Sequence, residues 1–304
     1  MLTLLARAKI NLSLDILYKR DDGYHEIESI MQSIETHDVL RIAPADTVKL
    51  RQRMTSNAVG PWLPQDARND VLKVALLMRE RYNVQQGALL QLQKFIPVQA
   101  GLGGGSADAA ATLVGLNILW GLGLDVSELE VLAAEIGSDT AFLIRGGTAL
   151  SKGRGEKLQD LPKLEPRWLT LFKPASGLST PRVFQNLDLA SLPAPSSREL
   201  ISWLEQNHAL KKPLPPLTNH LKDSALSLLD ELAVFGAVLQ EKGFEWQLSG
   251  SGSTIFVFAD SKQEALYLKS LAPSNWWKMT TRTATTGVKL LHAKNIPGRI
   301  QYER

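Results

Sequence analysis

Apolar and polar positions alternate near the start of the chain. Between residues 9 and 16 the alternation has a period of two, which predicts a β-strand with one buried face. The polar face of this strand carries Lys9, Asn11, Ser13 and Asp15. A turn signal at residues 21–23 follows, so we expect Tyr24 and His25 to lie in or near a loop.

Helical spacing and strand alternation follow each other through the next hundred residues. Residues 69–82 show apolar positions close to helical spacing, and residues 90–93 alternate like a strand. Residues 107–119 are rich in Ala and Leu, which favour helix, and glycines at 121 and 123 end that segment. A glycine run joins the two, so the predicted order is strand, glycine loop, helix.

The second half of the chain has its own pattern. Helical spacing recurs at residues 197–207 and 221–239, and a Gly- and Ser-rich turn at 249–253 leads into an apolar strand. A chain of 304 residues is long enough for two packed domains. We therefore predict an N-terminal domain over 1–158 and a C-terminal domain over 159–304.

Composition adds limits on partners and location. Hydrophobic residues make up 44% and charged residues 21%, which is typical of folded globular proteins. The formal net charge is only +3 and no long basic run occurs, so we expect no nucleic-acid partner. The chain has no Cys, which fits a reducing compartment, and we expect a cytoplasmic location. No targeting peptide or membrane-spanning stretch is evident, so we expect no membrane partner.

The strongest chemical signal is the run Pro97-Val98-Gln99-Ala100-Gly101-Leu102-Gly103-Gly104-Gly105-Ser106. Its glycines let backbone N–H groups turn toward an anion, and the following helix adds the positive end of its dipole. The run lacks the Gly-Lys-Ser/Thr of a Walker A loop. By itself it fits a phosphate loop or a flexible turn in which Ser106 or Asp108 caps the helix.

Three motifs, in order along the chain, resemble those of the GHMP kinases, named for galactokinase, homoserine, mevalonate and phosphomevalonate kinases. They are Ala8-Lys9-Ile10-Asn11-Leu12, the glycine run, and Leu248-Ser249-Gly250-Ser251-Gly252-Ser253-Thr254-Ile255-Phe256. The resemblance implies a two-domain α+β GHMP kinase fold. In that fold the N-terminal domain resembles a ribosomal-protein fold and the C-terminal domain is an α/β sandwich. It also implies phosphoryl transfer from ATP, with Mg²⁺, to an alcohol.

Further motifs resemble one branch of this superfamily, which phosphorylates the 2-hydroxyl of a cytidine diphosphate-linked methylerythritol in the non-mevalonate isoprenoid pathway. They are Asp22-Gly23-Tyr24-His25-Glu26, Met31-Gln32, Gly137-Ser138-Asp139 and Gly153-Arg154-Gly155-Glu156. The Asp-Gly-Tyr-His segment is the specific part. Departures are His220, where the branch usually has an acidic residue, Ser253, where Pro or Ala is common, and an unmatched tail after about residue 275.

The resemblance assigns Lys9 and Asp139 as the catalytic pair. In this assignment Lys9 orients Asp139 and counters charge on the transferring group, while Asp139 accepts or orients the hydroxyl proton. From the residues alone, Lys9 also fits a solvated position on a strand. Asp139 likewise fits a helix N-cap.

The resemblance also assigns the binding residues. ATP would contact Pro97 and the segment from Gly101 to Ser106, with Asn69 and Lys94 on the adenine side. The alcohol substrate would contact Asn11, Tyr24, His25 and Thr180, with the two rings on its cytidine part. Mg²⁺ is expected with ATP, but no metal ligand is assigned. The expected partner is a small molecule, and the chain is expected to be a monomer or a homodimer.

Three other interpretations stay open. A homoserine or mevalonate type of GHMP kinase has no use for Tyr24 and His25. A module that only senses ATP has no need of both Lys9 and Asp139. A nucleic-acid-binding domain is disfavoured by the low net charge.

Overall fold

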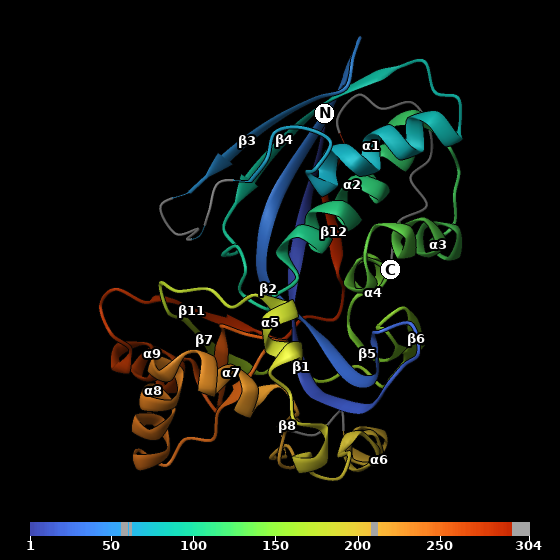
Figure 1. The fold of residues 1–304 in the computed structure, drawn as a ribbon. Coiled ribbons are helices and arrows are strands. Elements are labelled where there is room, and N and C mark those ends of the chain that lie inside the picture. Colours follow the sequence, from blue (N-terminus) through green and yellow to red (C-terminus); the bar gives the residue numbers. More distant parts are fainter. Residues whose placement is uncertain (56–59, 61–62, 208–211, 294–304) are drawn as a thin grey trace.

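The computed structural model describes residues 1–55, 60, 63–207 and 212–293. Within these residues two β-sheets form the frame of the molecule, and helices pack on both (Figure 1). The larger sheet has the strand order β12-β1-β2-β4-β3, with β5 and β6 continuing from β2 and β8 lying beside β1. The smaller sheet has the order β11-β7-β10-β9. This architecture confirms the predicted α+β class.

The strands divide between the two sheets. The larger sheet contains β1 (Leu2–Lys19), β2 (His25–Ala45), β3 (Lys49–Met54), β4 (Gly87–Lys94), β5 (Thr148–Gly153), β6 (Lys157–Asp160), β8 (Thr218–Asn219) and β12 (Val288–Ala293). The smaller sheet contains β7 (Trp168–Lys173), β9 (Gln247–Leu248), β10 (Ile255–Ala259) and β11 (Trp277–Arg282). Strands β1 and β2 are long enough to run through both halves of the molecule (Figure 1).

Helices cover one face of the larger sheet and flank the smaller one. The first group is α1 (Asp70–Arg81), α2 (Gly104–Trp120), α3 (Val126–Ile136) and α4 (Ser138–Arg145). The second group is α5 (Thr180–Gln185), the 3₁₀ turn η1 (Leu189–Ser191), α7 (Lys222–Leu228), α8 (Asp230–Glu241) and α9 (Lys262–Leu271). Helix α6 (Ser197–Asn207) packs instead on β1 and β2 of the larger sheet. In the described part of the chain no helix is both long and apolar enough to cross a membrane.

Helix α2 lies at the centre of the N-terminal half. Every residue from 107 to 117 is buried, and α2 packs against β1, β2, α1 and α4. This agrees with its even mixture of Ala, Leu and Val, which leaves no polar face for solvent. A second core forms around the smaller sheet, where the Phe235 ring contacts Phe172 and Trp276 edge to face.

Strand β1 differs from its prediction in one respect. The polar face carrying Lys9, Asn11, Ser13 and Asp15 is buried, like the apolar face. The reason is that segments from the second half of the chain cover it: β8 pairs in parallel with β1, and residues 196 and 197 donate hydrogen bonds to Asp15.

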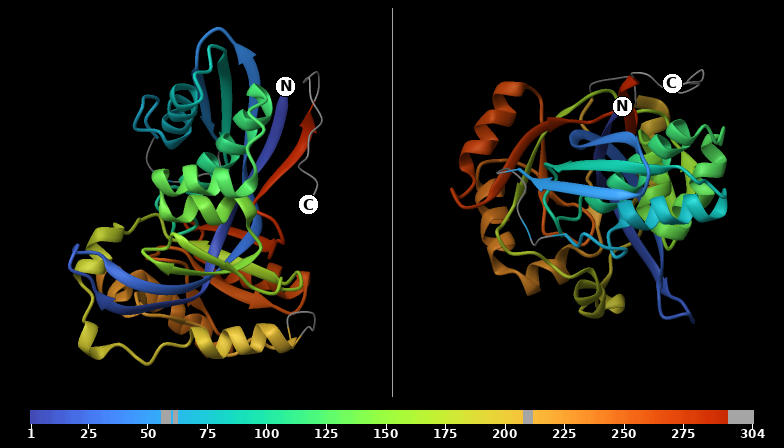
Figure 2. Two further views of the ribbon diagram at one scale, coloured as in Figure 1. Left: turned by 90° about the vertical axis from the view of Figure 1, so that its right-hand side faces the viewer. Right: turned by 90° about the horizontal axis from the view of Figure 1, so that it is seen from above.

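The described part of the unmatched tail after residue 275, which ends at residue 293, contains β11 and β12. Strand β12 pairs antiparallel with the first residues of β1, so the end of the described chain closes an edge of the N-terminal sheet (Figure 2). The C-terminal sequence thus contributes to both sheets. The division at residue 158 stays a prediction.

Candidate active site

The glycine run forms a tight loop between β4 and α2. Gly101 and Gly103 have φ of 72° and 68°, which few residues other than glycine adopt. Gly103 is the N-cap of α2, and no side chain caps the helix. The interpretation in which Ser106 or Asp108 is the cap is therefore wrong. The first N–H groups of α2 have no side-chain cap among the described residues, which suits an anion.

Lys9 and Asp139 lie together beside this loop. Lys9 is 4% exposed, and its Nζ is 3.2 Å from Oδ2 of Asp139 and donates to Oδ1 of Asn11 at 2.8 Å. A Cβ added to Gly103 would be 3.2 Å from Cγ of Lys9, so the lysine stem lies against the loop. Lys9 is therefore not the solvated strand lysine that the sequence also allowed.

Asp139 stands in the first turn of α4 without capping it. The N-cap is Gly137, whose backbone is extended, and no side chain makes a capping hydrogen bond there. The helix-cap interpretation is thus wrong. The Asp139 side chain is 32% exposed, so one face of the carboxylate pairs with Lys9 and the rest is open to a ligand.

Aromatic rings gather where β2 begins. His25 and Phe184 have ring centroids 5.1 Å apart, and the Arg154 guanidinium lies 4.7 Å from the centre of the Tyr24 ring. Tyr24 is 56% exposed and free to contact a planar ligand. The sequence prediction assigned no role to Phe184 or Arg154. The sequence could have indicated Phe184, because it follows Thr180 by four residues and so lies on the same face of α5 as that predicted site residue.

The surroundings of His25 favour the neutral form of its ring. Burial, together with the charge of Lys19, lowers its pKa below the ordinary value for histidine. A neutral imidazole presents both a donor and an acceptor, which is the chemistry needed to recognise the edge of a base.

A second glycine loop, residues 249–253, packs directly on the first. Ser249 Oγ donates to the Gly101 carbonyl at 2.9 Å, and Thr254 N donates to the Ala100 carbonyl at 3.2 Å. A Cβ at Gly101 would lie 2.1 Å from the Ser249 carbonyl oxygen, so only glycine permits this approach. Thr180 Oγ1 lies 2.8 Å from Ser251 Oγ, which brings this predicted site residue to the same place.

Asn69 and Lys94 are engaged within the protein. Asn69 caps α1, with Oδ1 accepting from Val71 N at 3.0 Å and Nδ2 donating to the Pro64 carbonyl at 2.8 Å. The Lys94 ammonium group contacts Asp38 and Asp108 beneath the glycine run. Contact of Asn69 or Lys94 with adenine stays a prediction.

Oxygen atoms suited to a metal are few in this region. The described residues contain no group of three or more His, Asp or Glu side chains that could hold an ion together. Ser106 Oγ is 3.9 Å from the position of a Cβ on Gly137, so this hydroxyl lies near the start of α4, where Asp139 also stands. A hydroxyl and a carboxylate are ligands that Mg²⁺ accepts when phosphates and water complete its shell.

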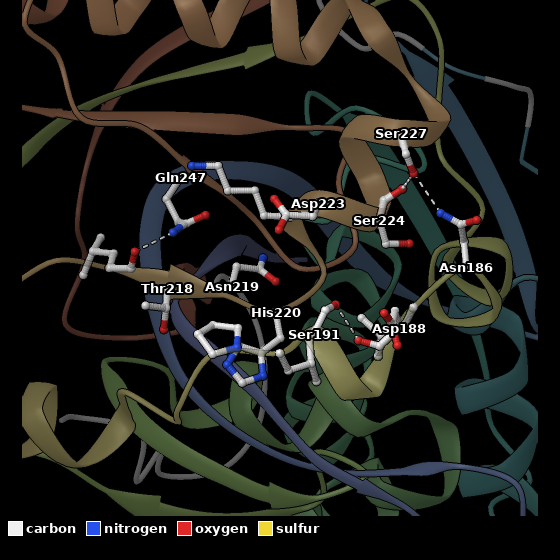
Figure 3. Close-up of a pocket in the computed structure, with 15 residues that line it drawn as sticks. Asn186, Asp188, Ser191, Thr218, Asn219, His220, Asp223, Ser224, Ser227 and Gln247 are labelled. Atoms are coloured by element: carbon white, nitrogen blue, oxygen red, sulfur yellow. Dashed lines mark hydrogen bonds between the residues drawn. The ribbon is translucent and has the colours of Figure 1, made fainter.

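A separate polar pocket of about 400 Å³ lies in the C-terminal half, between α5, β8 and α7 (Figure 3). None of the predicted site residues lines it. Asn219 connects the pocket to the active site, because it lines the pocket and its Nδ2 donates to the Leu248 and Gly250 carbonyls at 2.9 and 2.8 Å. Asn219 thereby supports the second glycine loop.

Comparison with known proteins agrees with this geometry. A model described as the GHMP kinases N terminal domain matches residues 69–147. A 4-diphosphocytidyl-2-C-methyl-D-erythritol kinase of Listeria monocytogenes serotype 4a (strain HCC23) is 40% identical over 261 residues, covering 84% of this chain and 86% of that protein. One from Shouchella clausii (strain KSM-K16) is 43% identical over 269 residues, covering 86% and 88%.

Solved structures show the same relationship. A crystal structure of 4-(cytidine 5'-diphospho)-2C-methyl-D-erythritol kinase matches with a TM-score of 0.77 at 28% identity, covering 92% of this chain and 98% of that one. A homoserine kinase from Cytophaga hutchinsonii matches with a TM-score of 0.71 at 18% identity, covering 95% and 97%, and shares the fold alone. The chain belongs to the 4-diphosphocytidyl-2-C-methyl-D-erythritol kinase family of the GHMP kinases.

Proposed function

We propose that this chain transfers the γ-phosphoryl group of ATP to the 2-hydroxyl of 4-diphosphocytidyl-2-C-methyl-D-erythritol. The observation that carries the chemistry is the Lys9–Asp139 pair, 3.2 Å apart, beside the glycine loop from Gly101 to Ser106. The names of the relatives support the choice of alcohol, and the rings of Tyr24, His25 and Phe184 provide a place for its base.

Asp139 and Lys9 divide the work of phosphoryl transfer. The loop backbone and the first turn of α2 hold the phosphates in line with the acceptor. Asp139 orients the alcohol and accepts its proton, while Lys9 offsets negative charge on the transferring group. Asn11 holds Lys9 in place: its Oδ1 accepts from Nζ, and its Nδ2 donates to Ser29 Oγ at 2.7 Å.

The remaining binding residues surround this centre. Tyr24 and Phe184 supply aromatic faces for cytosine, His25 supplies a ring that can hydrogen-bond its edge, and Thr180 lies on the same side. The resemblance assigns Asn69 and Lys94 to the adenine side of the loop. Bound Mg²⁺ would neutralise phosphate charge, and the Ser106 hydroxyl would help to hold it. The lack of Cys agrees with a cytoplasmic location.

One assay tests the proposal. Purified enzyme is mixed with ATP, Mg²⁺ and either the cytidyl substrate, homoserine or mevalonate, and formation of ADP is followed. We expect turnover with the cytidyl substrate alone and inhibition by CDP that competes with it. Turnover with homoserine or mevalonate but not with the cytidyl substrate would refute the choice of alcohol. ATP binding with no turnover on any alcohol would refute the kinase assignment.

A further inference from the structure

Three charged side chains are buried directly beneath the glycine loop. They are Asp38 on β2, Lys94 at the end of β4 and Asp108 in the second turn of α2, and each is at most 2% exposed. Lys94 Nζ contacts both carboxylates and also approaches the Gly104 carbonyl at 3.4 Å. We call this group the Asp38–Lys94–Asp108 cluster. Apart from the adenine contact that the resemblance assigns to Lys94, none of its members has a role in the transfer described above.

The cluster joins the two ends of the loop. On the entry side, Asp38 Oδ1 accepts hydrogen bonds from the backbone N–H groups of Phe95 and Ile96, at 2.5 and 2.9 Å, where the chain leaves β4. On the exit side, Lys94 reaches Asp108 and the carbonyl of Gly104, where α2 begins. One ammonium group therefore fixes the distance between the strand end and the helix start.

The charges of the cluster are balanced for a site that binds an anion. Burial alone lowers the pKa of Lys94, but the charges of Asp108 and Asp38 outweigh it and raise that pKa, so the amine stays protonated. Burial raises the pKa of Asp108 well above its usual range despite the attraction of Lys94, and Asp108 Oδ1 has no hydrogen-bond partner among the described residues. Protonation of Asp108 would leave no excess negative charge under the loop.

We propose that Asp38, Lys94 and Asp108 are positioning residues for ATP, which hold the ends of the glycine loop so that its N–H groups face the phosphates. The inference rests on the proposed function, since it takes residues 101–106 as the phosphate loop. It gives Lys94 a different task from the adenine contact predicted by resemblance. Lys94 acts through the loop backbone because its ammonium group is already occupied by the two carboxylates and a carbonyl.

The test replaces Asp38, which is 0% exposed and has no direct path to a nucleotide. Asp38→Asn keeps the volume but turns an NH₂ group toward either the Lys94 ammonium group or the two backbone donors. Affinity is measured by calorimetry with a non-hydrolysable ATP analogue, so the result does not depend on the alcohol. We expect the dissociation constant to rise about tenfold, while the KM for the cytidyl substrate changes less than about twofold.

Asp15→Asn is the matched control. Asp15 is equally buried, and its carboxylate also accepts from two consecutive backbone N–H groups, those of Ser196 and Ser197, at 3.1 and 2.9 Å. It has no contact with the glycine loop. We expect a comparable loss of thermal stability in both variants, with weaker analogue binding only in Asp38→Asn.

The outcomes separate the two proposals. If Asp38→Asn melts earlier but binds the analogue as wild type does, or more tightly, the cluster is merely structural and the inference is wrong. Should this variant not fold, Asp108→Ala replaces it, since it removes the oxygen that Lys94 contacts on α2 and leaves the Asp38–Lys94 pair intact; unchanged analogue affinity then refutes the inference equally. Wild-type enzyme that binds the analogue but ignores the cytidyl substrate refutes the choice of alcohol alone.

Discussion

Lys9 is held in place by burial and by two polar partners. Its ammonium group is removed from water and contacts Asn11 Oδ1 and the Asp139 carboxylate, so it has one position relative to the glycine loop. Its own backbone N–H donates to the Leu102 carbonyl at 3.0 Å, which fixes the side chain relative to the loop. Position, as much as chemical type, therefore makes this lysine suitable for phosphoryl transfer.

Asp139→Asn tests the catalytic pair. Asn keeps the volume of Asp, and α4 begins at Gly137 without a side-chain cap, so the fold should tolerate the change. The amide cannot accept the hydroxyl proton, and we expect kcat to fall by about 10² to 10⁴ with nearly unchanged ATP affinity. Steady-state kinetics and a thermal melt measure both effects.

Asp125→Ala is the control for a change at a neighbouring helix. Asp125 is a true N-cap, with a complete capping box on α3, so its loss should cost about 1 kcal/mol of stability and leave kcat alone. Near-normal turnover by Asp139→Asn would show that Asp139 is not the proton acceptor.

His25→Ala tests the base site. We expect a higher KM for the cytidyl substrate and an unchanged KM for ATP, because His25 contacts Phe184 and no part of the glycine loop. In wild type the KM should also rise as pH falls through the lowered pKa of His25, since protonation removes the acceptor nitrogen. The variant should lack this pH dependence. The control is His292→Ala, on the exposed edge strand β12, which should match wild type in both respects. Equal constants for wild type, His25→Ala and His292→Ala would show that His25 does not bind the base.

At the scale of the element, local patterns in the sequence predicted several of the helices and a few of the strands. Residues 69–82 and 197–207 form helices, and the glycine run joins β4 to α2. The predicted helical segment 221–239 divides into α7 and α8 at Leu229, whose backbone is extended with φ −150° and ψ 84°. No Gly or Pro marks that break, and the apolar spacing continues across it. The position of the break is therefore set by packing against the rest of the molecule, which the local pattern does not show.

The sequence could not reveal which polar residues would meet at the loop. Asp38 lies 56 residues before Lys94, in a segment with no turn or motif signal, and only the pairing of β2 with β4 brings them together. Phe184 meets His25 for a similar reason. Whether side chains from distant segments meet depends on the topology of the fold, and a periodic pattern in the sequence does not encode topology.

Gly103→Ala tests the loop as an element. Gly103 has φ 68°, and its new Cβ would lie 3.2 Å from Lys9 Cγ and 3.3 Å from Leu143 Cδ1. We expect weaker ATP binding and a lower kcat, because the methyl group displaces either the loop or the catalytic lysine. Gly123→Ala is the control: its φ is 71° but no atom lies within 4 Å, so it carries only the backbone strain, about 1 to 2 kcal/mol. Equal kinetics in the two variants would show that the loop tolerates a side chain there.

At the scale of the whole molecule, the two halves are tied together at several places. Strand β12 closes the edge of β1, and Ile34 forms a bridge with Thr283. The second glycine loop bonds to the first through Thr254 N and the Ala100 carbonyl. These contacts join residues far apart in the chain. Segments on the two sides of the predicted boundary at residue 158 therefore pack and pair with each other in the structure.

A fragment of residues 1–158 tests this dependence. It lacks β12, which pairs with residues 2–6 of β1, and it loses the cover over the polar face of that strand. An uncovered strand edge and exposed buried surface favour aggregation, so we expect the fragment to show no cooperative thermal transition by circular dichroism. Joining residues 283–293 to the fragment through a flexible linker restores the edge strand, and we expect partial recovery of a cooperative melt. A fragment that melts cooperatively near the temperature of the full chain would instead establish residues 1–158 as an independent domain and show that β12 contributes little to its stability.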